Sequence, residues 1–440
     1  MSPLSRRALL GTVPLIGVGG LAGVAATPGA VPAAEAASSR PIYFSCWDNT
    51  YRFGKGTRSA VTIDSRGGLV LSRGTTRVRF DDPYGPARSY DRGSWTSPRV
   101  TTPFALTELI ASWNASTPTG TWVEVALQGR TTSGRTTRWY LLGRWVSGDA
   151  SSDIHRASVD GQTDTYATVN TDTFATHNGY KIVSYVLRVN LYRPAGSSAT
   201  PRVGLISGMA SALPKASTVT VSAKGGAQGK VLAVPTYSQE KHRGHYPKWD
   251  GGGEAWCSAT STAMVLDYWR LGPPASATSW VTVKGETRPQ VDHVARCVYD
   301  YTYEGTGNWP FNTAYAGARG ARSFVTRLRS LREAEEFIKA GIPLICSVSF
   351  RSSELTGAGY STNGHLLVIV GFAANGDVVI NDPASHLMAS DAQVRVTYRR
   401  SQFENVWIPR SGGLVYVIAP WSRALPRTLV RGEPNWGSPG

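Results

Sequence analysis

Cysteine and long apolar stretches are both scarce in this 440-residue chain. Only 4 cysteines are present, with no C-x-x-C pair and no clustered histidines, so the sequence offers no zinc framework and we expect no metal and no cofactor. After the N-terminal region no run approaches the roughly 18 apolar residues that span a bilayer, so no transmembrane helix is expected in the mature chain. If the thiol of Cys257 is free, at most one disulfide can form among Cys46, Cys297 and Cys346.

The N-terminal residues have the features of an export signal. Arg6 and Arg7 precede an apolar, glycine-rich run, and Ala34-Glu35-Ala36 supplies the small residues of a cleavage site. The paired arginines resemble the twin-arginine type of signal. We therefore expect residues 1–36 to be removed and the mature protein to be secreted or associated with the cell wall. An uncleaved membrane anchor is the alternative, which the small-residue site disfavours.

Acidic residues are also in the minority, because 46 Lys and Arg face 30 Asp and Glu for a formal net charge of +16. Such a surplus suggests nucleic acid as a partner. The arginines are scattered, however, and no zinc-finger, RNA-binding or helix-turn-helix signature accompanies them, so we expect no specific nucleic-acid partner. For an exported protein, the charge fits electrostatic association with anionic cell-wall polymers or lipid headgroups. A basic composition without any partner is the simpler interpretation.

Residues 37–195 show the alternation of apolar and polar residues that is typical of short β-strands. The longest strict alternation runs through residues 183–191, and Gly, Ser, Thr, Asn and Asp separate the shorter runs. Repeated short strands predict an all-β domain of the sandwich or jelly-roll type. Domains of this kind bind sugars or support a neighbour, and no motif decides between these roles. We favour an accessory domain.

The composition and the hydrophobic pattern of the sequence change after residue 195. Breaker residues predict a linker over 196–230, although 203–209 has the pattern of a strand. Residues 231–425 combine helical and strand patterns, which predicts an α+β domain, and 426–440 form a C-terminal tail. The predicted helices of this domain are 258–271 and 331–340, and its predicted strands are 342–350, 365–372, 378–381 and 414–418.

Three residues of this domain have the chemistry of a thiol hydrolase. Cys257 falls on the first turn of a predicted helix, where unpaired N–H groups and the helix dipole stabilise a thiolate and a developing oxyanion. His365 opens an apolar strand, where its imidazole can take the thiol proton. Asp382 ends the next strand at a proline turn, where a carboxylate can orient the imidazole. Each residue alone is as well explained by a structural role; the ordered combination favours catalysis.

The ordered segments resemble the papain-like cysteine peptidases, and within them the bacterial group related to bacteriocin-processing, double-glycine peptidases. The resemblance covers about residues 231–420 and implies a papain-like fold, a peptide or protein substrate and a thioester intermediate on Cys257. It implies His365 as the base, Asp382 as its partner and Gln239 as a donor to the oxyanion hole. The segments that carry it are Val-Pro-x-x-Ser-Gln at 234–239, Trp-Cys-Ser at 256–258, Ala-Gly-Ile-Pro-Leu at 340–344, Gly-His and an apolar run at 364–372, and Asn-Asp-Pro at 381–383.

Some positions depart from the pattern of that group. An insertion at 241–254 separates Gln239 from Cys257 by more residues than usual, and it is expected to form a loop over the cleft. Ser258 stands where Gly is common, and His386 competes with His365 for the role of base. The histidines of the insertion are interpreted as solvated. We predict an exported cysteine peptidase with cell-wall peptide among its candidate substrates; the alternative is a cell-wall or glycan-binding protein with an inactive papain-like domain.

Overall fold

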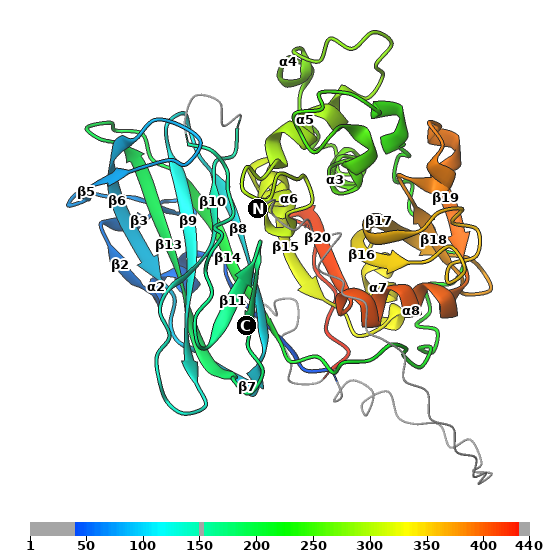
Figure 1. The fold of residues 1–440 in the computed structure, drawn as a ribbon, viewed down its shortest axis with the longest axis horizontal. Helices are drawn as coiled ribbons and strands as arrows, with labels where there is room; N and C mark the ends of the chain where they lie inside the picture. The colour runs from blue at the N-terminus through cyan, green and yellow to red at the C-terminus, as the bar shows by residue number, and fades with distance from the viewer. Residues whose placement is uncertain (1–39, 149–153, 431–440) are drawn as a thin grey trace.

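The computed structural model describes residues 40–148 and 154–430, so the predicted export signal lies outside the described residues. A β-rich N-terminal half and an α+β C-terminal half lie side by side in Figure 1. No helix within the described ranges is long and apolar enough to cross a membrane.

Two antiparallel sheets form the N-terminal half, as predicted for an all-β domain. The first has the strand order β11-β12-β8-β14-β4-β3, with β1 on β14, and the second has the order β10-β9-β13-β6-β2, with β5 on β6 and β7 on β13. The first consists of β1 Ile42–Trp47, β3 Val61–Ile63, β4 Leu69–Leu71, β8 Glu108–Ser116, β11 Ala167–Asn170, β12 Thr173–Thr176 and β14 Arg202–Ser211. The second consists of β2 Thr57–Ser59, β5 Thr76–Phe80, β6 Arg88–Thr96, β7 Val100–Leu106, β9 Trp122–Thr131, β10 Tyr140–Trp145 and β13 Ile182–Pro194. A short helix, α2 (Thr50–Gly54), follows β1.

The N-terminal half extends further along the chain than the sequence predicted. β14 lies inside the range 196–230 that breaker residues marked as a linker, yet it pairs with both β8 and β1. Gly196 and Ser197 belong to a turn after β13, in which Ser197 N donates to Pro194 O, because a breaker cluster marks a tight turn as readily as a domain boundary. The connection between the halves therefore begins after Ser211.

A six-stranded antiparallel sheet with the order β15-β20-β16-β17-β18-β19 organises the C-terminal half. In Figure 1, α3 and α5 lie on one side of this sheet and α7 and α8 on the other. The strands are β15 Ala321–Arg327, β16 Leu344–Phe350, β17 Thr362–Phe372, β18 Val378–Asn381, β19 Arg395–Tyr398 and β20 Leu414–Pro420. The helices are η2 Gln239–His242, η3 Gly253–Ala255, α3 Cys257–Tyr268, α4 Ala275–Thr278, α5 Pro289–Val298, α6 Trp309–Ala318, α7 Leu331–Lys339, η4 Ser385–Leu387, η5 Asp391–Gln393 and α8 Arg400–Ser411.

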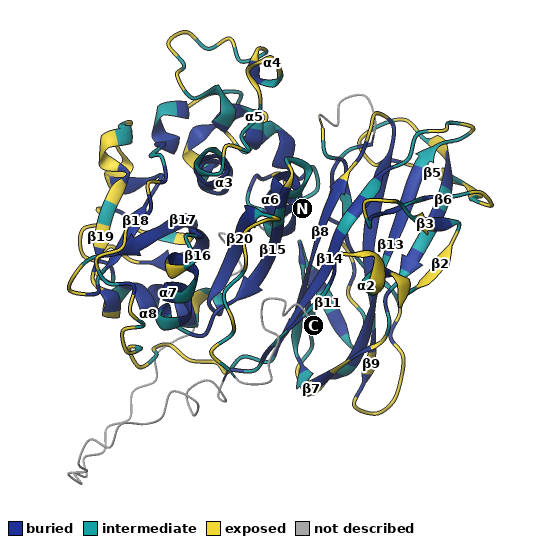
Figure 2. Ribbon diagram, turned by 180° about the vertical axis from the view of Figure 1, so that it is seen from behind, coloured by how far each residue is buried: buried dark blue, intermediate teal, exposed yellow. Residues whose placement is uncertain are grey.

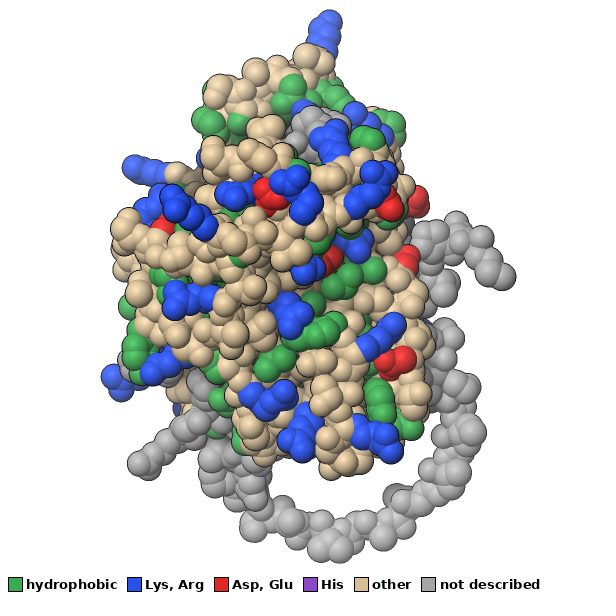
Figure 3. Space-filling view, turned by 90° about the vertical axis from the view of Figure 1, so that its left-hand side faces the viewer, with side chains coloured by type: hydrophobic (Ala, Val, Ile, Leu, Met, Phe, Trp, Pro, Cys, Tyr) green, Lys and Arg blue, Asp and Glu red, His purple; other side chains and the backbone are tan. Residues whose placement is uncertain are grey.

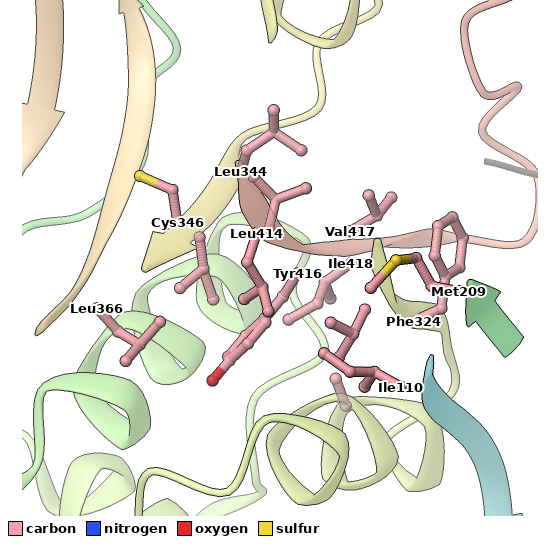
Figure 4. Packing of buried hydrophobic residues seen from close by; sticks show 14 of the residues in the cluster. Ile110, Met209, Phe324, Leu344, Cys346, Leu366, Leu414, Tyr416, Val417 and Ile418 are labelled. Carbon is pink, nitrogen blue, oxygen red and sulfur yellow. The ribbon is translucent and has the colours of Figure 1, made fainter. Parts of the chain in front are cut away.

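The two halves share one continuous apolar core. Figure 4 shows Ile110 and Met209 of the first sheet beside Phe324 of β15 and Ile418 of β20, and Figure 2 shows the facing strands as buried. Asn114 adds polar links across the junction, because its amide donates to the carbonyl of Ser323 at 2.8 Å and its oxygen accepts from the N–H of Ser323 at 3.1 Å. The N-terminal half therefore packs against one edge of the C-terminal sheet, and other strands of the same sheet carry the candidate site.

Candidate active site

Cys257 is the first residue of α3, and its free thiol is partly exposed. The helix begins without a side-chain cap, so the N–H groups of its first turn and the positive end of its dipole face the region around the sulfur. Gly252 lies shortly before Cys257 and has a φ of 116°. Residues with a side chain rarely adopt this conformation, so the turn into the helix needs a glycine here. The backbone N–H of Leu366 donates to Cys257 Sγ at 3.5 Å, which joins the helix to β17.

His365 lies inside β17, three residues after its start, and Asp382 directly follows the neighbouring strand β18. β17 and β18 pair with Val368 opposite Asn381, which brings the His365 end of β17 next to the residue after β18. His365 Nε2 lies 2.8 Å from Asp382 Oδ1, and both residues are buried. Since Nε2 faces the carboxylate, Nδ1 is the ring nitrogen left for Cys257, and the influence of Cys257 on the pKa of His365 places the thiol near the ring.

Asp382 is held as an anion by several donors. Tyr360 Oη donates to its two oxygens at 3.0 and 2.9 Å, and Tyr398 Oη donates to Oδ2 at 2.8 Å. The N–H of Ala384 donates to Oδ1 at 3.0 Å. Burial raises the pKa of Asp382, but the charge of His365 and these hydrogen bonds outweigh it and leave the pKa below its ordinary value.

The histidine responds in the opposite direction. Burial lowers the pKa of His365, but the charges of Asp382 and Cys257, and hydrogen bonds with both, raise it to about 10. The imidazole therefore keeps its proton at neutral pH. The Tyr360 ring stands edge-on to it, with centroids 5.6 Å apart and planes at 80°, which limits rotation of the imidazole.

Gln239 lies close to the start of α3 despite the insertion. It is buried in η2, and its backbone N–H donates to Pro383 O at 2.9 Å, next to Asp382. Its side-chain Nε2 donates to the carbonyl of Glu254 at 2.7 Å, just before Cys257. A second contact of Nε2, with Glu240 Oε1, is long at 3.4 Å, so one N–H of the amide is only weakly engaged.

The competitor His386 is placed differently from His365. It is exposed, has a φ of 55°, and its Nδ1 lies 2.8 Å from Ser385 Oγ. Ser258, which departs from the family pattern, is buried with its hydroxyl 3.0 Å from Tyr416 Oη. The structure thus pairs Asp382 with His365 and not with His386. Ser258 fits after Cys257 because its hydroxyl contacts Tyr416 of β20.

The histidines of the insertion face inward, although other residues of the insertion are exposed. His242 is fully buried, and Gly253 packs so tightly on the backbone of Gln239 and His242 that an added Cβ would overlap both. The interpretation of His242 and His245 as solvated residues is therefore wrong, because η2, η3 and α5 pack against one another around them. Periodicity could not reveal this, since neither short helix has a repeating apolar face.

Sequence reasoning also missed Tyr360 and Tyr398. Tyr398 ends β19, which pairs with β18 and so lies next to the strand that ends before Asp382. Tyr360 lies only a few residues before His365 in the same segment. A buried carboxylate needs donors, so polar-tipped aromatics near the two strands were the available signal.

Comparison with known proteins gives matches over both halves. Residues 231–415 match the Peptidase_C39 like family, and residues 43–211 match the Peptidase C39 N-terminal domain. No curated protein matches the chain.

Solved structures are similar only over parts of the chain. The enzymatically active domain of bacteriophage CBA120 tailspike protein 4 is 9% identical over 39% of this chain and 19% of that chain, with a TM-score of 0.17. The structure of infectious bursal disease virus Gt strain is 12% identical over 45% and 36%, with a TM-score of 0.17. TmCBM61 in complex with beta-1,4-galactotriose is 9% identical over 39% and 88%, with a TM-score of 0.16. Likenesses this low carry no argument.

The two family matches agree with the two halves of the fold and with the resemblance inferred from the sequence. They cover the β-rich half with its two antiparallel sheets and the α+β half that contains Cys257, His365 and Asp382. The resemblance to bacteriocin-processing peptidases is thereby confirmed. The chain belongs to the peptidase C39-like family, and its N-terminal half is a domain associated with that family.

Proposed function

We propose that this protein is an exported cysteine peptidase that hydrolyses a peptide bond through Cys257, His365 and Asp382. One observation carries the proposal: His365 is bonded through Nε2 to a buried carboxylate, and its other nitrogen is left for a thiol at the start of a helix. Membership of the family implies a peptide substrate.

In the proposed reaction, Cys257 Sγ attacks the carbonyl carbon as a thiolate while His365 holds the proton. The imidazolium then protonates the amine nitrogen as the C–N bond breaks, which leaves a thioester on Cys257 and a neutral His365. Water attacks the thioester, gives its proton to His365, and releases the acid and the regenerated thiolate. Asp382 stays ionised throughout and keeps the charged ring oriented.

The oxyanion of each tetrahedral intermediate needs donors near Cys257. The backbone N–H of Cys257 is one, because the first turn of α3 has no side-chain cap. The weakly engaged N–H of Gln239 Nε2 is the other. The hydrogen bond from Gln239 Nε2 to the carbonyl of Glu254 fixes the amide beside the segment that precedes Cys257.

Features outside the site support the proposed location and substrate class. The paired arginines and small residues of the N-terminal segment support export. Figure 3 shows Lys and Arg side chains scattered over the outer face of the N-terminal half, with few Asp and Glu between them. This surface supports an accessory role in which the β-rich half holds the enzyme on anionic cell-wall polymers, so cell-wall peptide is the substrate we favour.

The experiment is hydrolysis of denatured casein by the purified mature protein, followed by mass spectrometry of the products. We expect cleavage by the wild type and by Cys46→Ala, the matched cysteine control from the N-terminal half. Cys257→Ala and His365→Ala should have no activity, and a Cys257 thioester should be detected in acid-quenched wild type. Undiminished cleavage by Cys257→Ala would exclude the proposed nucleophile. Absence of any cleavage of casein and of cell-wall peptide by the wild type would favour the non-catalytic binding protein.

A further inference from the structure

Four side chains with metal-binding atoms converge in and beside the insertion. They are His242, His245, Glu286 and Asp292, and their donor atoms all lie within 4.8 Å of one another. His242 belongs to η2 and Asp292 to α5, so the cluster joins two separate segments of chain. The cluster is distinct from the Cys257, His365 and Asp382 triad.

The distances fit a tetrahedral metal ion. His242 Nδ1 lies 3.0 Å from Asp292 Oδ2 and 3.4 Å from Glu286 Oε2. His245 Nδ1 lies 3.0 Å from Asp292 Oδ1 and 3.6 Å from Glu286 Oε2. Zinc bonds of about 2.0–2.1 Å place tetrahedral ligands about 3.3–3.5 Å apart. Each of the four contacts is therefore within about 0.5 Å of a tetrahedral edge, although the two contacts to Asp292 end on different oxygens, and the widest separation in the set, up to 4.8 Å, has to shorten when the ion binds. The two imidazole planes stand at 81°, so the two Nδ1 atoms approach from different directions.

Hydrogen bonds alone serve this arrangement less well. A protonated Nδ1 donates one proton, yet each Nδ1 faces oxygens of both Glu286 and Asp292. The buried carboxylates form their ion pairs, among the described residues, with these two histidines.

The position of His242 also favours a metal ligand. It is fully buried, and its Nε2 has no hydrogen-bond partner among the described residues. Its Nδ1 can take part in only one hydrogen bond at a time, although it faces oxygens of both Glu286 and Asp292, so hydrogen bonds leave part of the cluster unsatisfied. A divalent ion instead balances both carboxylates and takes the lone pairs of two neutral histidines.

The surroundings favour a soft-to-borderline ion over calcium or magnesium. The donor set contains two imidazole nitrogens, which suit zinc and related transition metals, whereas calcium and magnesium prefer oxygen ligands throughout. The Trp256 ring lies near His242, with centroids 6.3 Å apart, and Tyr246 lies near His245, with centroids 6.5 Å apart. An apolar shell of this kind excludes water and strengthens the binding of a metal.

We infer that His242 Nδ1, His245 Nδ1, Glu286 and Asp292 form a structural site for a zinc-class divalent metal ion. The ion fastens the insertion to α5 and the segment before it. Because η2 contains both Gln239 and His242, the same ion fixes the helix that holds Gln239 against Glu254. This inference departs from the expectation of no metal drawn from the sequence, because the four ligands come from separate segments and only packing of the insertion on α5 brings them together.

The test measures metal and not hydrolysis, so its result is independent of the proposed peptidase activity. Mature protein carrying Cys257→Ala is stripped with EDTA, dialysed and titrated with Zn²⁺ by calorimetry, and bound metal is counted by mass spectrometry. Co²⁺ serves as a spectroscopic probe, since tetrahedral cobalt absorbs visible light far more strongly than octahedral cobalt. Anomalous scattering from Zn²⁺-soaked crystals then locates the ion.

Matched variants assign the site. Asp292→Asn keeps the shape and an acceptor oxygen but removes a charge, and His245→Ala changes a partly exposed ligand that is less critical for packing. The control His155→Ala removes the histidine of a comparable pair, whose Nδ1 lies 2.8 Å from Asp82 in the N-terminal half. We expect one equivalent of Zn²⁺, tetrahedral cobalt absorption, and at least about a 100-fold loss of affinity in either site variant but not in the control. Failure of the parent protein to bind one equivalent, or unchanged affinity in His245→Ala, would overturn the inference.

Discussion

Nε2 of His365 in β17 lies 2.8 Å from Oδ1 of Asp382, the residue after β18, and neither side chain is open to solvent. The bond fixes which ring nitrogen is free, and it fixes the charge of the ring through the raised pKa of the histidine. Both properties are consequences of the β17–β18 register and can be tested separately.

Replacement of Asp382 by Asn should impair catalysis while preserving the fold. The amide has nearly the same shape but no charge to stabilise the imidazolium, and its N–H₂ cannot accept the proton of Nε2. We expect kcat to fall by roughly 10²–10⁴. Steady-state kinetics on a casein-derived peptide, with near-ultraviolet circular dichroism as the folding control, measure the effect. A variant with kcat within about twofold of wild type would remove Asp382 from the proposed mechanism.

Activity should persist to unusually alkaline pH. Because the pKa of His365 is raised from 6.5 to about 10, the imidazolium that protonates the leaving amine is present until the pH approaches that value. The alkaline limb of kcat/KM should therefore have its midpoint near pH 10 and move to lower pH in Asp382→Asn. A midpoint near pH 6.5 in the wild type would contradict the geometry around the ring.

The same shift predicts how stability depends on pH. A folded-state pKa above the unfolded one stabilises the protein fully below about pH 6.5, and this contribution is lost as the pH rises through about 10. Free energies of unfolding in urea, measured for wild type and His365→Ala between pH 6 and 10, should therefore converge as the pH rises. A constant or widening difference over this range would show that His365 is not stabilised as a cation.

Tyr398→Phe should lower the free energy of unfolding and raise the pKa of Asp382. The hydroxyl donates to buried Asp382 Oδ2 at 2.8 Å, and loss of such a bond to a charged group costs about 1–3 kcal/mol. Without this hydrogen bond the pKa of Asp382 should rise. A lowered carboxyl pKa stabilises the folded protein, and this stability is lost as the pH falls through the folded-state pKa. In the variant, acid unfolding should therefore begin at a higher pH than in the wild type. Acid-unfolding curves measure this, with the exposed Tyr51→Phe as the matched control. Equal curves for the two variants would rule out the role assigned to Tyr398.

Gln239→Ala separates an oxyanion donor from a positioning residue. If the free N–H of Nε2 contacts the oxyanion, kcat should fall by roughly 10²–10³ while KM changes little. If the amide only holds the carbonyl of Glu254, the melting temperature should fall and kcat should change by less than about tenfold. Kinetics and differential scanning fluorimetry on the same preparation distinguish the two, and the second result would remove Gln239 from the oxyanion hole.

The two halves should unfold together. Their shared core and the paired hydrogen bonds between Asn114 and Ser323 tie β8 to β15. Asn114→Ala should lower the free energy of unfolding by about 1–3 kcal/mol, because it leaves buried groups of Ser323 unpaired. Tryptophan fluorescence and loss of peptidase activity should follow one transition in both proteins. Two resolved transitions in the wild type would mean that the halves are independent.

The parts of the fold that follow from local pattern were predictable. Apolar runs predicted 378–381 as a strand, with the bounds that β18 has, and the helix at 331–340 differs from α7 by one residue at its end. Cys257 begins α3 and Asp382 follows β18, as predicted, whereas β17 begins at Thr362, so His365 lies inside this strand and does not open it. β14 was missed as part of the first half because turn residues before a strand resemble a linker.

Contacts between distant segments were not predictable in this way. Tyr398 reaches Asp382 only through the pairing of β19 with β18. His245 and Asp292 meet only because the insertion packs on α5, and no periodicity in either segment encodes that contact. A single sequence carries the pattern of each element but not the identity of its partners. The three residues proposed as the triad could therefore be named from the sequence, whereas the tyrosines that contact Asp382 could not.

The charge state of Cys257 is the most direct test of the account. Purified protein is treated with iodoacetamide at pH 6, where an ordinary thiol is only about 0.3% ionised, and the labelled peptides are followed over time by mass spectrometry. Burial raises the pKa values of Cys46 and Cys346, so these thiols should react slowly. We predict that Cys257 is labelled at least about 100-fold faster than they are, and that His365→Ala removes most of this advantage. Equal labelling of all cysteines, or fast labelling of Cys257 that does not depend on His365, would contradict the thiolate–imidazolium pair.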